Sequence, residues 1–381
     1  MDFTFTEDQI AFRDSISKFL MTEAAPELLR DIWETESGRS ADLWAKIAEQ
    51  GLMSVSVPEA EGGMGMSDMD WLLLLQELGY YGLPDVVSDT AYVAVGMLAA
   101  LPEAHPARTQ WLPLIAEGQC RVAVGHLLNP LVADAGVADM LLLPHVVEGG
   151  TELHLLTAQQ CAITPVASFD TSRRLSKVTW TPTAATCIAD AAQGQHIWNL
   201  AGERGALAAS AQLLGLSQRM LDLSVDYVAQ RKQFDKVIGS FQAVQHHLAD
   251  IVTQIEFAKP VLYRACYALQ DGEADLSVRI SHAKLQCGAA GNLAARNSLQ
   301  VHGAMGYTWE VDLQMFMKRA WVLESAWGDD AFHKERLTQG LLRSANPPAG
   351  PGATFDRFSA LSKASLGQAA TENNVLEEVS A

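Results

Sequence analysis

The stretch RKQFDKVIGSFQAVQHHLADI, which runs from Arg231 to Ile251, decides how the rest of the chain is interpreted. It opens with a basic residue, a turn and an aromatic side chain, and then continues as a helix with one apolar face. The chain around it is acidic, with a formal net charge of −18. An acidic protein that binds an anion needs local basic residues, and Arg231, beside Gln233 and Phe234, is a candidate for that role.

The composition limits the class of function. The 381 residues are 49% hydrophobic and 19% charged, which favours two or three ordinary domains with a large buried core. The negative charge argues against nucleic acid, whose phosphates need a positive protein face, and against an anionic membrane surface. We therefore expect neither nucleic acid nor membrane as a partner.

Cysteine usage and the first residues bear on the compartment. The five cysteines are scattered and form no C-x-x-C pair, so a reduced compartment is expected and a disulfide framework or zinc site is not. His246 and His247 have no second ligand at a suitable spacing, so we predict no metal. The start, MDFTFTEDQIAF, lacks the features of a signal peptide, and no stretch approaches the ~18–20 apolar residues that span a bilayer. The prediction is a cytoplasmic protein.

Hydrophobic periodicity divides the chain into successive regions. Residues 1–118 are predicted to form an N-terminal helical domain, because Thr6 and Gln9 fit a capping box, Gly51 can stop a helix over 42–50, and Ser67 can cap another. In residues 119–193, short apolar runs near 120–127, 138–147, 152–158 and 177–182 predict a small β domain.

The remainder of the chain is predicted to be helical up to residue 345. Helices are expected over 205–227, from Ser240 onward, over 276–301 and over 329–342. Residues 346–381 show little periodicity and are predicted to be a flexible tail. The order predicts a mainly α protein with a small β domain in the middle and an up-and-down four-helix bundle over 194–345.

Three stretches of this sequence resemble the flavin-dependent acyl-CoA dehydrogenases. RKQFDKVIGSFQAVQHHLADI is similar to that family's R-x-Q-F-G-x-x-I-x-x-F-Q signature, and QVHGAMGYTWEVDLQMFMKRA to its Q-x-H-G-G-x-G-Y-T signature. LWAKIAEQGLMSVSVPEAEGGMG resembles its N-terminal helix and Pro–Gly–Gly corner. Two long signatures in the family's order are specific evidence. The resemblance implies the acyl-CoA dehydrogenase fold and an FAD cofactor that lies between two subunits.

The resemblance also implies roles for residues at the matching positions. Arg231 matches the arginine that reaches the pyrophosphate of the neighbouring subunit's FAD, as a fixed cation with several donors. Gln233 and Phe234 match the residues that flank the adenine end. Gln300 and Gly303 match the turn over that end, where glycine permits close backbone approach.

The sequence departs from the family at the catalytic base. The family's reaction needs a carboxylate with a raised pKa against the substrate's α-carbon. In many members it precedes a Gly-Thr ahead of the last helix, where this chain has Trp327 before Gly328. Other members carry it on the earlier long helix, at the position of Gly205. Glu203 is two residues away, roughly 200° around the helix, and Asp329 is placed to act as a helix N-terminal charge.

Other departures lie in the FAD-binding signatures and in the middle region. Asp235 and Ala304 replace glycines of the two signatures, and the Leu-Thr-Glu-Pro strand end of the family is missing. The elements that reach into a neighbour's flavin site are kept, while those that build this chain's own pocket are weakened. That pattern is similar to one subunit of the α2β2 acyl-CoA dehydrogenases of bacterial steroid catabolism.

Three interpretations stay open from the sequence alone. The first is a subunit that lacks the base and lends FAD-binding residues to a related catalytic partner, the complex acting on a bulky alicyclic acyl-CoA with an electron-transfer flavoprotein-like acceptor. The second is a self-sufficient homotetrameric enzyme with an unusual base, Glu203 or Asp329. The third is a flavin-free helical scaffold, for which an arginine at position 231 would have no use.

Overall fold

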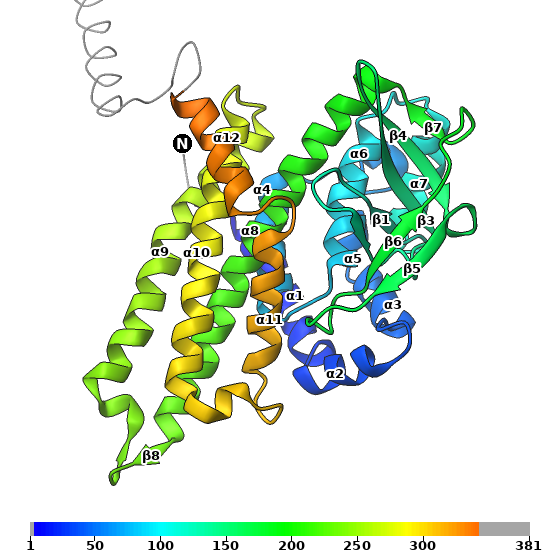
Figure 1. Cartoon of the computed structure of the whole chain (residues 1–381). Helices are drawn as coiled ribbons and strands as arrows, with labels where there is room; N and C mark the ends of the chain where they lie inside the picture. The colour runs from blue at the N-terminus through cyan, green and yellow to red at the C-terminus, as the bar shows by residue number, and fades with distance from the viewer. Residues whose placement is uncertain (1–3, 343–381) are drawn as a thin grey trace, which may run out of the picture.

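The computed structural model describes residues 4–342, so the predicted tail over 346–381 lies outside the described residues. Helices fill the first part, strands lie between Val122 and Ala189, and long helices follow. In Figure 1 the strands and the short helices that cover them form one side of the molecule, and the long helices stand beside them as a bundle. This arrangement is the predicted mainly α fold with a small β region.

The N-terminal helices begin at the predicted caps. Helix α1 (Glu7–Glu23) starts at Thr6, whose hydroxyl accepts from the Gln9 N–H while the Gln9 side chain accepts from the Thr6 N–H. Helix α3 (Ala41–Glu49) buries the apolar face of the stretch predicted to be helical and ends before Gly51, whose φ is 82°. Asp70 accepts from both the N–H and the hydroxyl of Ser67, where α4 (Asp68–Tyr80) begins.

Shorter helices complete this region, and α4 connects it to the bundle. They are α2 (Pro26–Glu34), α5 (Asp85–Ser88), α6 (Val95–Ala99) and α7 (Pro106–Ala116). A Cβ added at Gly79 of α4 would lie 2.1 Å from the backbone oxygen of Gln212 on the next long helix. The two helices therefore pack with their backbones in contact, which only glycine permits here.

The strands between Val122 and Ala189 form two small sheets. The first has the order β1 (Val122–Val124), β3 (Met140–Val147), β4 (Gly150–Thr157) and β7 (Cys187–Ala189), with β1 and β3 parallel and the others antiparallel. The second has the order β2 (Leu131–Ala133), β6 (Leu175–Thr179) and β5 (Ala162–Val166). The predicted strand stretches contain β1 and β3 and overlap β4 and β6, while β2, β5 and β7 were not predicted.

A separate apolar cluster holds the two sheets together. Its buried members are Ala123, Val132, Ala135, Ala138, Leu141, Leu143 and Leu156. Strands β3 and β4 pair over their whole length, from Met140 opposite Thr157 to Val147 opposite Gly150. This hairpin is the longest paired element of the β region and turns one face inward, with Leu153 fully buried.

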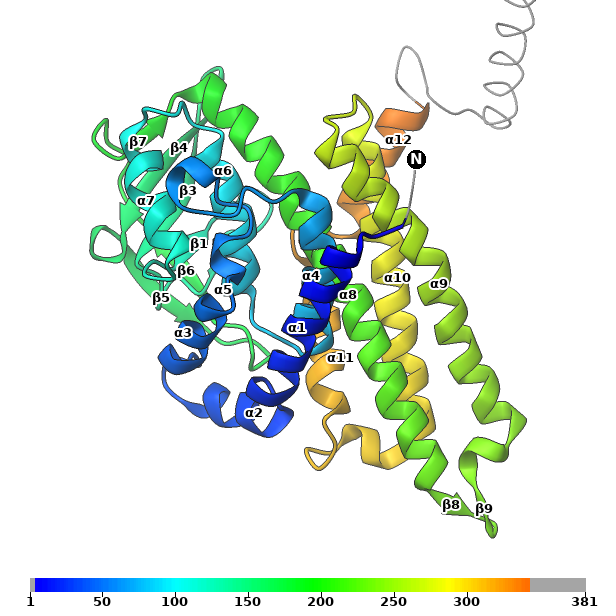
Figure 2. The same cartoon turned by 180° about the vertical axis from the view of Figure 1, so that it is seen from behind.

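The bundle consists of α8 (Ala191–Gln230), α9 (Gln242–Gln270), α10 (Leu276–His302) and α11 (Leu313–Ser325), and α12 (Asp330–Leu342) packs on α10. Helix α8 is longer than predicted because Asp190 caps it directly after β7, accepting from Ala192 and Gln193 N–H groups. At its other end, strands β8 (Lys232–Gln233) and β9 (Lys236–Val237) form a hairpin that extends past the bundle in Figure 2. Helix α11 was not predicted. None of the helices between residues 4 and 342 is long and apolar enough to cross a membrane.

Candidate functional site

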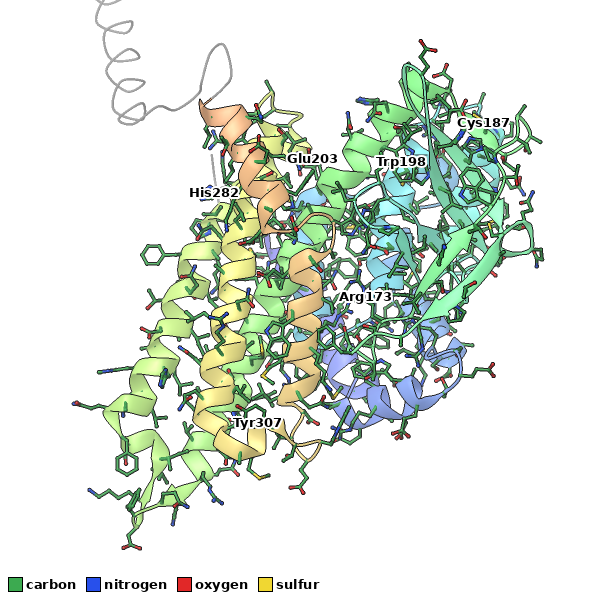
Figure 3. The ribbon with its side chains drawn as sticks, in the orientation of Figure 1. Arg173, Cys187, Trp198, Glu203, His282 and Tyr307 are labelled. Carbon is green, nitrogen blue, oxygen red and sulfur yellow. The ribbon has the colours of Figure 1, made fainter. Side chains whose placement is uncertain are left out.

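A cavity of about 400 Å³ lies between the first half of α8, the loop after β1, the turn before α12 and α12 itself. Helix α8 contributes Gln195, Trp198, Asn199, Gly202 and Glu203 to its wall. These positions follow the i, i+3, i+4, i+7, i+8 spacing of one helix face. Figure 3 shows Trp198 and Glu203 on this part of α8. The sequence analysis did not predict this helix face, although the spacing of the five residues is visible in the sequence.

Trp327 stands at one of the two base positions that the resemblance implies, and its indole packs against Gly205, which stands at the other. Trp327 is 9% exposed and lines the cavity. A Cβ added at Gly205 would lie only 2.1 Å from Cδ2 of this indole. The two alternative base positions inferred from the resemblance therefore meet at one point in space. At that point the chain carries an indole and a glycine, and neither can accept a proton.

The other face of the indole packs on a histidine. The rings of His126 and Trp327 are stacked with centroids 4.5 Å apart. Burial, and secondly the positive charge of Arg173, lowers the pKa of His126 to about 4, so its ring is neutral near pH 7. Its buried Nδ1 has no hydrogen-bond partner among the described residues. The indole is therefore held between α8 and the loop after β1.

Buried polar groups fix the turn that presents Trp327. The backbone of Trp327 has φ 58°, a left-handed conformation that is rare for a bulky residue. Lys284 donates to the carbonyl oxygens of Glu324 (2.6 Å) and Gly328 (3.2 Å). His333 Nε2 donates to the carbonyl of Trp327 at 3.2 Å, and His333 Nδ1 accepts from the Ser281 hydroxyl at 3.1 Å. Because these donors satisfy its carbonyls, the turn holds a strained conformation.

Glu203 lies in the cavity wall, which corrects the expectation that it faces away from the site. The cavity covers enough of the circumference of α8 to include both Glu203 and the indole on Gly205. Burial raises the pKa of the Glu203 carboxyl, and the ion pair with Arg336 of α12 opposes that shift. The carboxylate is thus engaged by an arginine.

Asp329 lies where its helix begins. It is exposed, and its Oδ1 accepts from the N–H of Phe332 at 2.9 Å. This is the geometry of a helix cap. The neighbouring Asp330 pairs with Lys334 on the surface. The structure therefore places Asp329 at a helix N-terminus, as its sequence position indicated.

The five residues predicted to bind FAD lie at the opposite end of the bundle. Arg231 ends α8, and Gln233 and Phe234 lie on the β8–β9 hairpin, with Phe234 86% exposed. Gln300 and Gly303 are at the end of α10, and both are exposed. The stacked rings of Tyr227 and His302, 4.3 Å apart, join these two ends. The structure thus gathers all five into one region, which we call the arm.

The arm and the cavity of this chain are far apart. At 1.5 Å per residue, the part of α8 between Glu203 and Arg231 is about 42 Å long. In Figure 3, Glu203 is near one end of the bundle and Tyr307 is near the other. Arg231 is exposed, and no carboxylate among the described residues pairs with it. The arm therefore cannot serve the cavity of its own chain.

Comparisons with known proteins agree with this architecture. A family model described as acyl-CoA dehydrogenase, N-terminal domain, matches residues 6–119, and one described as acyl-CoA dehydrogenase, C-terminal domain, matches residues 193–342. The chain is 30% identical over 321 residues to acyl-CoA dehydrogenase IpdE2 of Mycobacterium tuberculosis, which covers 82% of this chain and 91% of that relative.

Solved structures share the fold. The chain is similar to a chain of the ChsE4-ChsE5 complex from Mycobacterium tuberculosis, with a TM-score of 0.82 at 23% identity, covering 91% of this chain and 100% of that one. It is also similar to a variant of the Tcur3481-Tcur3483 steroid ACAD, with a TM-score of 0.76 at 21% identity, covering 87% and 97%. Since a 30% identical relative matches over most of both lengths, this chain belongs to the acyl-CoA dehydrogenase family of oxidoreductases.

Proposed function

We propose that this chain is the subunit of a hetero-oligomeric acyl-CoA dehydrogenase, α2β2 in composition, that lacks the catalytic base and lends its arm to the FAD site of a related partner. The observation that carries the proposal is the separation within α8. One end has an indole where the base would be, and the other, about 42 Å away, has an exposed arginine without a carboxylate partner among the described residues.

The arm fits a flavin dinucleotide supplied by a neighbouring subunit. The guanidinium of Arg231 would bind the pyrophosphate, since a planar fork of donors suits two phosphate groups. Gln233 and Phe234 would flank the adenine end, and the turn from Gln300 to Gly303 would cover it. FAD, when bound, supplies the hydride acceptor for the α,β-desaturation of a CoA thioester. This chain's residues would only bind and orient it.

The substrate proposal is a CoA thioester of a steroid side chain or of another bulky alicyclic acyl group. It is supported by the similarity to a solved steroid ACAD and by the similarity to a chain of a two-component complex. We propose an electron-transfer flavoprotein-like protein as the acceptor that reoxidises the flavin.

A self-sufficient homotetramer is the second candidate, and one observation favours it. Glu203 lines the cavity, and burial raises its pKa, as a general base would require. Its ion pair with Arg336 would then have to open during turnover. The third candidate, a flavin-free scaffold, gives no reason for the exposed Arg231.

The deciding experiment is an absorbance spectrum of the purified chain, alone and co-purified with an acyl-CoA dehydrogenase encoded beside it. We expect a colourless lone chain and a yellow complex with about one flavin per pair of subunits. A yellow lone chain that an acyl-CoA bleaches would overturn the proposal in favour of the second candidate. A colourless complex would favour the scaffold.

Two substitutions sharpen this experiment in the complex. Glu203→Gln and Asp329→Asn keep the side-chain shapes and remove the carboxylates. We expect both to leave turnover within a few-fold of the parent complex, because the base belongs to the partner. A loss of several orders of magnitude in turnover for either variant, with flavin content unchanged, would make that residue the base.

A further inference from the structure

Three side chains on one face of the β3–β4 hairpin converge outside the cavity and the arm. His145 lies opposite Glu152 in the ladder, and His154 follows Glu152 by two residues, so all three lie on the same face of the sheet. One nitrogen of each histidine and one carboxylate oxygen lie within 4.8 Å of one another. Cys187, which pairs with His154 in the ladder and is labelled in Figure 3, marks this outer part of the sheet.

The distances within this cluster are close to those of a metal site. Glu152 Oε2 is 2.9 Å from His145 Nδ1 and 3.1 Å from His154 Nε2. Ligand atoms that bind zinc tetrahedrally at 2.0–2.1 Å are roughly 3.3 Å apart. The two distances from the carboxylate are thus within a few tenths of an ångström of that value, and the two nitrogens lie within 4.8 Å of each other.

A second contact orients His154 as a ligand. Its side chain is 1% exposed, and its Nδ1 lies 2.9 Å from Thr186 Oγ1. The Thr186 hydroxyl donates to the carbonyl of Thr183 at 3.0 Å, so Oγ1 can accept the hydrogen of His154 Nδ1. In the neutral ring, Nε2 then presents a lone pair to the Glu152 carboxylate, and a cation between them would satisfy both. Metal-binding histidines usually donate their other N–H in this way.

The surroundings leave an entry path. Trp180 packs on the rings of His154 and His145, with centroid distances of 4.9 and 6.2 Å, and covers one side. The side chains of His145 and Glu152 are 38% and 28% exposed, so the other side is open to water. Two imidazoles with one carboxylate suit zinc and similar transition metals, whereas calcium and magnesium prefer oxygen ligands.

We propose that His145, Glu152 and His154 bind a divalent transition metal ion of the zinc class, with water at the remaining position. The ion would tie β3 to β4 and, through the Thr186 contact, to the segment before β7. The prediction of no metal considered His246 and His247 and missed this set, which the pairing of β3 with β4 assembles. The proposal is independent of the FAD arm.

The test measures zinc binding to the full chain after a chelator has removed bound metal. In equilibrium dialysis against micromolar Zn²⁺, we expect one equivalent bound by the parent chain and at least tenfold weaker binding by His145→Gln and Glu152→Gln. Both side chains are partly exposed, so both variants should fold, which circular dichroism checks. His246→Gln, which changes an exposed histidine on α9, is the matched control and should bind like the parent.

Two results would overturn the proposal. One is a parent chain that binds no stoichiometric zinc under these conditions. The other is binding that the His145 and Glu152 variants share unchanged with the parent and the His246 control, which would assign the zinc to scattered surface histidines. A thermal melt gives a second readout, since an ion that binds only the folded chain raises its melting temperature. That rise should be absent in both ligand variants.

Discussion

The two ends of α8 carry opposite kinds of surface. At the cavity end, Trp327 is packed between Gly205 and His126, and the turn that presents it is held by buried donors. At the arm end, Phe234 is 86% exposed, and Tyr307 and Trp309, which follow Gly303 in the chain, are 75% and 65% exposed. Large exposed aromatic groups of this kind mark interaction sites. At the cavity end the aromatic side chain is packed inside the chain. At the arm end the aromatic side chains are exposed and suit contact with a partner.

On the proposed function, this difference shows how a subunit can lack the reaction and keep an interface. A carboxylate removed from a buried site leaves a cavity or an unsatisfied neighbour, which costs stability unless another group fills the space. Here an indole fills it. The five arm residues are exposed, and on the proposed function their role is to bind the FAD of a partner subunit.

The largest effect should come from removing the indole. Trp327→Ala deletes a buried ring that contacts α8 and His126, and we expect the free energy of unfolding to fall by about 3–5 kcal/mol. Chemical denaturation of the lone chain measures it. Trp309→Ala is the control, because that ring is 65% exposed and should cost less than about 1 kcal/mol. Equal losses of unfolding free energy for the two variants would mean that Trp327 is packed no more tightly than the exposed Trp309.

The next effect concerns the arm. Arg231→Ala in the co-purified complex should lower FAD affinity by about 10- to 150-fold, the equivalent of ~1.5–3 kcal/mol for a charged hydrogen bond. Flavin content after gel filtration gives the result. Lys236→Ala removes an exposed cation from the same hairpin and should leave the content unchanged. Parent-like flavin retention by Arg231→Ala would remove the arginine from the FAD site.

Lowering the pH should reduce the stability of the folded chain through a buried histidine at the cavity end. His333 is fully buried, and burial lowers its pKa to about 3, against about 6.5 in the unfolded chain. Between these values the unfolded state binds more protons, so stability falls as the pH drops below 6.5. At pH 5 the loss from His333 should be on the order of 2 kcal/mol.

The variant His333→Gln isolates this contribution. Glutamine can still donate to the Trp327 carbonyl and accept from Ser281, but it does not titrate. We expect its unfolding free energy to decline less than that of the parent between pH 7 and pH 5. Parallel declines would assign the acid sensitivity to other groups, among them His126, whose pKa burial lowers to about 4.

Local patterns predicted the fold well where one short stretch decides an element. The capping box of Thr6 with Gln9, the helix stop at Gly51 and the apolar faces of the long helices are all as the sequence indicates. Strands β2 and β7 are three residues long and pair with distant segments, so they are too short for a local hydrophobic pattern to predict them. Helix α11 is buried on several sides, which weakens its amphipathic pattern.

The site was predictable only in part, for a related reason. Two matching signatures predicted the arm residues, and within each signature these residues are close in sequence. The cavity depends on contacts between segments far apart in the chain: Trp327 with Gly205, and Glu203 with Arg336. The angle between Glu203 and Gly205 around the helix correctly places them on different faces of α8. It does not show that the cavity is wide enough to include both Glu203 and the indole that packs on Gly205. The proposed metal-ligand cluster of His145, Glu152 and His154 was missed because the sequence analysis did not consider the pairing of β3 with β4.

The smallest predicted effect compares two left-handed residues at the two ends. Asp235 has φ 59° in the two-residue turn between β8 and β9, and Trp327 has φ 58°. Glycine relieves this backbone strain at both positions. The greater conformational entropy of glycine in the unfolded chain offsets part of that gain in stability. Asp235→Gly should therefore stabilise the exposed hairpin by about 0.5 kcal/mol, which slower amide exchange at Lys236 would show. Trp327→Gly should destabilise the chain by several kcal/mol, since the buried indole is lost. If both changes stabilised, backbone strain would outweigh packing at the cavity end, and the comparison between the two ends would fail.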